Sequence, residues 1–137
     1  MKTNFESEIY AQPDVLRALV EDKAAKVTDI VAQIKVHDPS FVMIAARGTS
    51  DNAATYGKYL FSAFNQTPVA LAAPSLYTLY KQPPDFGNGL VVGISQSGET
   101  PDVMAVLEAA KGQGAPQQAD GLAIASRGHA TSAEYAE

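Results

Sequence analysis

Short continuous apolar runs alternate along the chain with longer stretches in which apolar residues recur every three or four positions. Continuous runs are typical of strands buried on both faces of a sheet, and the recurring spacing is typical of amphipathic helices. The pattern predicts strands at 41–46, 68–73, 90–95 and 121–126, helices at 13–35, 53–64 and 101–111, and a short helix or turn at 74–81. This alternation predicts a parallel sheet with helices on both faces.

Residues with special backbone or capping properties mark the ends of the predicted helices. Pro13 is expected to open the first helix, and Asn65 to close the second. Thr100 followed by Pro101 predicts an N-cap with a proline at the first helical position. Gly112 predicts the end of that helix.

The overall composition narrows the classes of function. The 137 residues show no internal repeat, and a hydrophobic share of 46% is sufficient for a buried core. A net charge of −5 with ten scattered basic residues argues against a nucleic-acid partner, because phosphate backbones are held by clustered Lys and Arg. The first residues lack the apolar region of a signal peptide, and no run approaches the roughly 18 apolar residues of a membrane span. The chain is therefore expected to be cytoplasmic, with no membrane partner.

Metal and cofactor sites have little support in the sequence. No cysteine is present, which excludes disulfides and cysteine-based metal or redox sites. The two histidines, His37 and His129, are far apart, and neither has a carboxylate at metal-ligand spacing. We therefore expect no metal and no cofactor.

The segment VVGISQSGETPDV (91–103) passes from an apolar strand to a helix through three hydroxyl residues. Ser95, Ser97 and Thr100 can donate to phosphate oxygens, and Gly98 allows close approach of a ligand or a positive φ. The N–H groups of the first helical turn add positive potential at the same place. An ordinary strand–loop–helix turn, whose hydroxyls only cap backbone groups, is equally compatible with these residues.

A second loop of this kind, RGTSDN (47–52), follows the strand at 41–46. In parallel sheets, ligands bind outside the carboxyl ends of the strands, where the strand order reverses. Two hydroxyl-bearing loops at strand ends of this kind support an anion site more strongly than one such loop would.

Other catalytic and nucleotide-binding motifs fit the sequence less well. GISQSG departs from the nucleophile elbow G-x-S-x-G, because Ser97 stands at its last position. No lysine follows the loop as a P-loop requires, and RGTSDN does not match the dinucleotide-binding pattern of glycines.

Three motifs occurring in order, ARGTSDNAATYGKYLF (46–61), APSLYTLY (73–80) and VVGISQSGETPDV (91–103), resemble the sugar isomerase (SIS) domain family of phosphosugar-binding proteins. The similarity is greatest to the isomerase half of glutamine–fructose-6-phosphate aminotransferases and to the related amino-sugar-phosphate deaminases and isomerases. EIYAQPDVLRALV (8–20) resembles the helix that precedes the first SIS domain in these proteins.

The resemblance implies a fold and a set of ligand contacts. The fold is α/β, a flavodoxin-like three-layer αβα sandwich around a five-stranded parallel sheet. It would occupy residues 37–137, after an N-terminal helical segment at 1–36. By position, the loop that binds the sugar phosphate corresponds to Ser95, Gln96, Ser97, Gly98 and Thr100. Thr49 and Ser50 correspond to the turn that meets the sugar chain, and Ser75 to a further ligand contact in some relatives.

The chain also departs from the family pattern. Leu76 stands where the aminotransferase branch often has Glu, which favours the deaminase-like branch. From the family pattern we expect a chain without a glutaminase domain or an N-terminal Cys nucleophile, with an atypical sequence from about 115 onward, and without the fifth strand and the second SIS domain. We therefore expect a C-terminally incomplete domain without an assigned catalytic residue. Glu99 is expected to lie in solvent and not to act as a base, and His129 to be exposed in the tail.

The resemblance implies a phosphosugar-binding SIS domain of an amino-sugar or hexose-phosphate isomerase, deaminase or aminotransferase. The ligand would be of the fructose 6-phosphate or glucosamine 6-phosphate class. A non-catalytic phosphosugar-sensing module and an inactive truncated fragment remain as alternatives. We expect a homodimer formed through the helices at 13–35 and 53–64, with a monomer whose tail covers the open sheet edge as the alternative.

Overall fold

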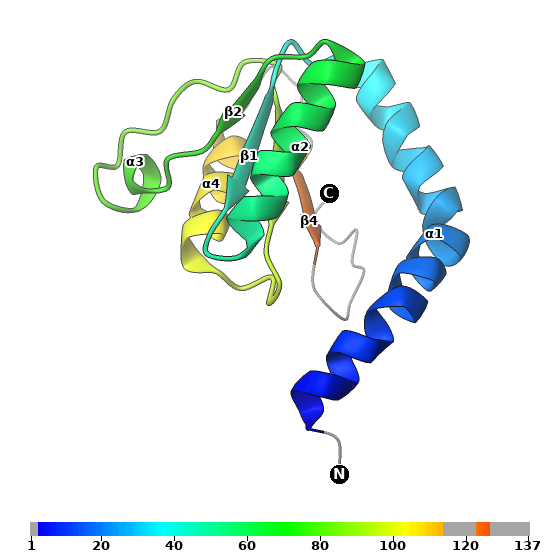
Figure 1. The fold of residues 1–137 in the computed structure, drawn as a ribbon. Coiled ribbons are helices and arrows are strands. Elements are labelled where there is room, and N and C mark those ends of the chain that lie inside the picture. Colours follow the sequence, from blue (N-terminus) through cyan, green and yellow to red (C-terminus); the bar gives the residue numbers. More distant parts are fainter. Residues whose placement is uncertain (1–2, 114–122, 127–137) are drawn as a thin grey trace. The chain divides into compact units, whose positions relative to one another are not determined.

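The computed structural model describes residues 3–113 and 123–126. Figure 1 shows the order of the elements along the chain. They are α1 (Asn4–His37), β1 (Val42–Ala46), α2 (Ser50–Asn65), β2 (Val69–Leu71), α3 (Ser75–Thr78), β3 (Leu90–Ile94), α4 (Pro101–Gly112) and β4 (Ala123–Ser126). The chain divides into two compact units, Met1–Val36 and His37–Glu137, which are described separately. None of the helices in the described part of the chain is both long and apolar enough to cross a membrane.

The four strands among the described residues of the second unit are parallel, in the order β2-β1-β3-β4. In the register, Val42 of β1 lies beside Val69 of β2 and Leu90 of β3. The chain leaves β1 toward β2 and then crosses back to place β3 on the other side of β1. The strand order therefore reverses between β1 and β3, which is where open parallel sheets bind ligands.

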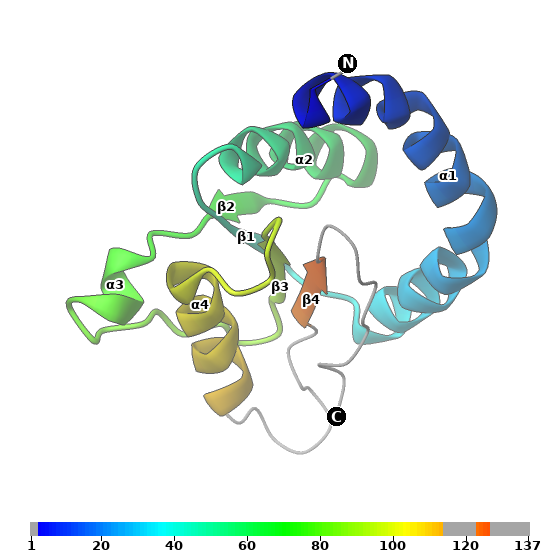
Figure 2. The same cartoon turned by 90° about the horizontal axis from the view of Figure 1, so that it is seen from below.

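Helices cover both faces of this sheet, so the predicted α/β sandwich is confirmed (Figure 2). α2 packs on the face to which Ile44 points, and the Cδ1 atom of Ile44 lies 3.3 Å from the place where a Cβ on Gly57 would stand. α4 packs on the other face, directly over Gly93 of β3. The buried cluster on the α4 side consists of Ala45, Tyr77, Phe86, Val91, Val103, Val106, Leu107 and Ala110.

The first helix starts earlier than the sequence pattern predicted. α1 begins at Asn4, and Pro13, the expected first residue, lies inside it. Thr3 and Glu6 form a capping box: the Glu6 N–H donates to Thr3 Oγ1 (3.2 Å), and the Thr3 N–H donates to Glu6 Oε2 (2.9 Å). These two bonds satisfy N–H groups that a helix start leaves free, so the helix begins before the proline. The prediction that Pro13 opens the helix is wrong.

The remaining boundaries differ from prediction by a few residues. α2 begins at Ser50, three residues before the expected Ala53, and ends at Asn65 as predicted. α4 includes Gly112, and Gln113 forms its C-cap. Apart from β4, the predictions for the tail concern residues that the structure does not describe. They are the atypical sequence from about 115, the absence of a fifth strand and the exposure of His129.

The Gln113 side chain ties the end of α4 to the 82–89 loop. Its Nε2 donates to the carbonyl oxygen of Pro84 (2.7 Å), and its Oε1 accepts from the N–H of Phe86 (3.1 Å). Phe86 in turn packs against Tyr77 with ring centroids 6.1 Å apart. The loop that leads into β3 is therefore fixed to the helix that follows β3.

Candidate functional site

Two loops that each lead into a helix lie together at the carboxyl ends of neighbouring strands. β1 and β3 are neighbours, and their last residues, Ala46 and Ile94, stand side by side in the register. Arg47–Thr49 leads from β1 into α2, and Ser95–Thr100 leads from β3 into α4. The structure therefore brings the two predicted loops to adjacent strand ends.

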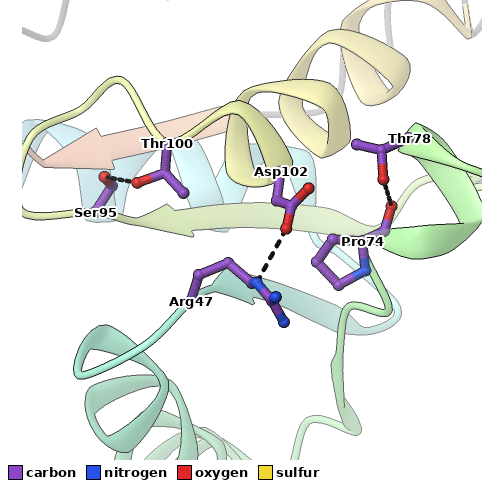
Figure 3. A network of polar contacts seen from close by, with 6 residues as sticks. All are labelled: Arg47, Pro74, Thr78, Ser95, Thr100 and Asp102. Atoms are coloured by element: carbon purple, nitrogen blue, oxygen red, sulfur yellow. Dashed lines mark hydrogen bonds and ion pairs between the residues drawn. The ribbon is translucent and has the colours of Figure 1, made fainter.

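The loop after β3 is organised around the Ser95 side chain, which is 9% exposed. Ser95 Oγ accepts from the N–H of Gly98 (3.1 Å) and shares a hydrogen bond with Thr100 Oγ1 (2.9 Å), as Figure 3 shows for the two hydroxyls. Gly98 has a φ of +71°, a value that favours glycine. These contacts fold the chain back on itself between the strand and the helix.

The tip of this loop has exposed polar side chains. Ser97 Oγ accepts from the N–H of Glu99 (3.1 Å), and the side chains of Gln96, Ser97 and Glu99 are all exposed. The exposure of Glu99 agrees with the expectation that its carboxylate lies in solvent.

Thr100 stands at the predicted N-cap position, with extended backbone angles and Pro101 as the first helical residue. Its backbone carbonyl accepts from the N–H groups of Val103 and Met104, both at 3.0 Å. Its side chain makes no capping hydrogen bond, because the hydroxyl is joined to Ser95 instead. The expected side-chain cap is therefore replaced by a bond that holds the loop.

The loop after β1 is built more simply. Gly48 has a φ of +60°, and Thr49 is the N-cap of α2 without a side-chain capping bond. Ser50 is the first residue of α2 and is half-buried, whereas the side chain of Thr49 is exposed. The Thr49 hydroxyl therefore makes no contribution to the start of its own helix.

An ion pair that the sequence analysis did not identify connects the two loops. Arg47 Nε lies 3.0 Å from Asp102 Oδ2 in the first turn of α4 (Figure 3). Each residue alone looks like a surface charge in the sequence. Their proximity follows from the placement of β3 beside β1, so only the strand order could have indicated it.

Ser75 is the first residue of α3, which follows β2. β2 is the neighbour of β1 on the side away from β3, so Ser75 also follows a strand end on this edge of the sheet. Its side chain is exposed, and its carbonyl accepts from the N–H groups of Leu79 and Tyr80. The adjacent Leu76 packs against the buried cluster.

The chemistry of this edge is that of hydrogen-bond donors. Helix starts carry a partial positive charge, and the loop hydroxyls add hydrogen-bond donors. Within residues 3–113 and 123–126, no group of three or more acidic or histidine side chains is placed to hold a metal ion. The arrangement is suited to bind an anion through neutral donors.

Comparisons with known proteins relate the chain to sugar-phosphate enzymes. It is 37% identical over 111 residues to the glutamine–fructose-6-phosphate aminotransferase (isomerizing) of Gloeobacter violaceus, which covers 78% of this chain and 18% of the relative. It is 35% identical over 115 residues to the enzyme of the same name from Chlorobaculum tepidum, covering 79% of this chain and 19% of the relative. The chain thus spans less than a fifth of the length of these curated relatives. No family model matches the chain.

Solved structures agree with these sequence matches. A crystal structure from Silicibacter pomeroyi, assigned as a phosphosugar isomerase, superposes with a TM-score of 0.79 at 31% identity, covering 88% of this chain and 35% of that one. The C-terminal domain of glucosamine-fructose-6-phosphate aminotransferase from Francisella tularensis superposes with a TM-score of 0.72 at 26% identity, covering 93% and 35%. The matches confirm the resemblance that the loop motifs indicated, and they confirm the fold class.

Proposed function

Since this chain is a homologue of SIS-family phosphosugar isomerases and aminotransferases, we propose that it binds the phosphate group of a hexose or amino-sugar phosphate at the carboxyl ends of β1 and β3. The observation that carries the proposal is the pair of donor-rich loops on adjacent strand ends, where the strand order reverses. Helix starts at such ends are common phosphate sites, because their N–H groups and dipoles favour negative charge.

In this proposal the SQSGET loop holds the phosphate. The side chains of Ser97 and Gln96 supply donors at the exposed tip, Gly98 forms the turn that follows them, and Ser95 and Thr100 form the base of the loop. Thr49 and Ser50 meet the sugar chain from the start of α2, and Ser75 is a more distant contact after β2.

The internal hydrogen bonds of the loop are compatible with a ligand. A hydroxyl has one hydrogen to donate and two lone pairs to accept. Ser97 Oγ accepts from Glu99 and keeps its hydrogen for a phosphate oxygen. If Ser95 donates to Thr100, the Thr100 hydrogen is available in the same way, and Ser95 still accepts from Gly98. The loop is then preorganised, which reduces the entropy lost on binding.

The reaction served by the site is proposed to be the conversion of a hexose 6-phosphate between aldose and ketose, with amine release or transfer in some relatives. It would begin with ring opening and continue with proton abstraction between C1 and C2. Because sugar phosphates are charged and do not diffuse across membranes, we propose that the chain acts in the cytoplasm. We also propose that residues 37–137 form the SIS domain and residues 1–36 a separate helical segment.

We further propose a homodimer in which α2 contributes to the contact. The outer face of α2 carries Tyr56, Tyr59, Leu60 and Phe64 at helical spacing, and all four are exposed, Phe64 by 81%. A helix that is apolar on its outer face as well as its sheet-facing side is typical of a buried helix. The stripe has no charged residue, so two copies can face each other without like-charge repulsion.

The test of ligand binding is isothermal titration calorimetry of the purified chain with fructose 6-phosphate and glucosamine 6-phosphate. We expect a dissociation constant on the order of 1 mM, and no binding of unphosphorylated fructose. Ser97→Ala should weaken binding several-fold, because a hydroxyl donor to a charged oxygen is lost. Ser40→Ala is the matched control, since Ser40 precedes β1 at the amino ends of the strands, away from the candidate site. There its hydroxyl donates to Asn88 Oδ1.

Two outcomes would contradict the proposal. No heat of binding and no thermal shift with any hexose phosphate at millimolar concentration would exclude the site. Equal weakening by Ser40→Ala and Ser97→Ala would show that the effect is not local to the loop.

A further inference from the structure

The ion pair between Arg47 and Asp102 joins two loops that are distant in the sequence. Arg47 directly follows β1, and Asp102 is the second residue of α4. The 3.0 Å contact between Arg47 Nε and Asp102 Oδ2 crosses from the end of one strand to the helix that follows its neighbour. Figure 3 shows the pair on the same edge as Ser95 and Thr100. Neither charged residue was among the predicted ligand contacts.

Asp102 occupies a position that is unfavourable for an anion site. It lies in the first turn of α4, where the positive end of the helix dipole attracts negative charge. A carboxylate there competes with a ligand phosphate for the same positive potential and repels it. Its side chain is only 33% exposed, so solvent screens this repulsion less than it would for a fully exposed carboxylate.

Arg47 supplies the compensating charge. Its side chain is 59% exposed, and a salt bridge this accessible to water contributes little to folding stability. Its guanidinium instead cancels the charge of Asp102 beside the loop and links the Gly48–Ser50 turn to the start of α4. Both effects bear on a ligand held between the two loops.

We propose that Arg47 is a positioning residue of the phosphate site that acts through Asp102. Its pairing neutralises the carboxylate in the first turn of α4 and keeps the two loops together. This inference rests on the proposed function of the same site. It assigns the arginine no direct contact with the ligand.

The chain offers a matched control for this proposal. Arg17 Nη1 and Asp14 Oδ1 form another ion pair, at 2.8 Å within α1. Arg17→Gln removes the same charge from a pair in the other compact unit. The overall charge changes equally in the two variants, and only Arg47→Gln changes the loops.

The experiment measures fructose 6-phosphate binding by calorimetry to the full chain and to five variants. Arg47→Gln should weaken binding about three- to tenfold, Arg47→Lys should retain most of the affinity, and Arg17→Gln should bind like the parent. Asp102→Asn should bind slightly more tightly than the parent. The double variant Arg47→Gln/Asp102→Asn should lose less affinity relative to Asp102→Asn than Arg47→Gln loses relative to the parent, because without the carboxylate Arg47 no longer holds the two loops together.

A pH arm separates charge neutralisation from a structural role. The phosphate group is mainly a dianion at pH 7.5 and a monoanion at pH 5, since its second pKa is near 6. Arg47→Gln should lose more affinity for the dianion than for the monoanion. A variant that only loosens the fold would bind both forms less well by the same factor.

The outcomes distinguish this inference from the proposed function. If the parent chain binds no hexose phosphate, the proposed function is overturned and the role of Arg47 falls with it. If the parent binds and Arg47→Gln binds equally well, only the role of Arg47 is overturned. If Arg47→Gln weakens binding as much in the Asp102→Asn background as in the parent, Arg47 acts on the ligand independently of Asp102, by its own charge or by contact, and the proposed mechanism is wrong.

Discussion

The segments β1–α2 and β3–α4 have the same order of elements but differ in how tightly their loops and helices are held. Each is a buried strand, a loop with a positive-φ glycine and hydroxyl residues, and a helix packed on the sheet. In β3–α4 the hydroxyls of Ser95 and Thr100 bond to each other, and the helix buries its apolar side chains. In β1–α2 the N-cap Thr49 makes no side-chain capping bond, and the outer face of the helix is apolar and exposed.

This difference suggests that the two loops have different roles at the candidate site. The β3–α4 loop has a geometry fixed by its own hydrogen bonds, as a phosphate cradle requires. The β1–α2 loop is held across the sheet edge through Arg47 and leaves its hydroxyl residues less constrained. The β3–α4 loop would fix the phosphate, and the β1–α2 loop would adapt to the sugar and to a partner subunit.

The largest expected difference between the two segments is the effect of a glycine-to-alanine substitution on the free energy of unfolding. A Cβ on Gly93 would stand 2.9 Å from Leu107 Cδ1 and 3.1 Å from Val103 Cγ1, inside the packing of α4 on β3. Gly93→Ala should therefore lower the free energy of unfolding by up to about 3 kcal/mol. A Cβ on Gly57 would meet only Ile44 Cδ1, at 3.3 Å, and alanine favours the helix. Gly57→Ala should therefore change the free energy of unfolding by less than about 1 kcal/mol, because the helix preference of alanine is offset by the displacement of Ile44 Cδ1.

Urea unfolding followed by circular dichroism measures both variants. Equal destabilisation by the two alanines would show that α2 is packed as tightly as α4.

The next difference concerns the hydroxyls of the two loops. Ser95→Ala should lower the free energy of unfolding by about 1–2 kcal/mol, because the Gly98 N–H loses its partner in a buried position. Thr49→Ala should change stability by less than about 0.5 kcal/mol, because its hydroxyl makes no capping bond. Thermal unfolding of both variants under the same conditions tests the contrast, and a Thr49→Ala loss as large as that of Ser95→Ala would refute it.

The outer faces of the helices should differ in self-association. Phe64→Glu on α2 should raise the dimer dissociation constant about tenfold or more, because it places a charge in the proposed apolar contact. Lys111→Glu, at an exposed position of α4, should leave it unchanged. Sedimentation velocity across a concentration series gives both constants. A parent chain that remains a single species of 14.4 kDa at every concentration would exclude the dimer.

The smallest expected effect lies in the cluster beneath α4. Burial raises the pKa of Tyr77 above its ordinary value of 10.0, and its hydroxyl donates to Met43 Sδ at 3.4 Å. Below pH 10 both folded and unfolded chains keep this proton. Above it the unfolded chain loses the proton first, so stability falls as the pH rises toward the raised pKa.

Tyr77→Phe should reduce this alkaline loss, and Tyr59→Phe, at an exposed position, should not. Urea midpoints measured between pH 8 and pH 11 test the difference. An identical alkaline loss in the parent and in Tyr77→Phe would remove Tyr77 as its cause.

Local patterns were sufficient to predict most of the fold and the position of the candidate site. Four apolar runs located the strands, and Thr100–Pro101 located the start of α4, because these signals act over a few residues. The start of α1 was missed because the capping box of Thr3 and Glu6 outweighed the proline that drew the prediction to residue 13. The Arg47–Asp102 pair and the Ser95–Thr100 bond depend on strand order and loop geometry, which no local pattern encodes.

The order of the strands also sets when the site can form. Val42 and Leu90, which pair at the centre of the sheet, are 48 positions apart in the chain. Contacts between distant segments are slow to form, because a long loop must close before they contribute any stability. During synthesis, the side of β1 that pairs with β3 would therefore have no partner strand until β3 has left the ribosome. Both halves of the phosphate cradle would appear in that same step, so the ligand could bind only the completed fold and would stabilise it by mass action.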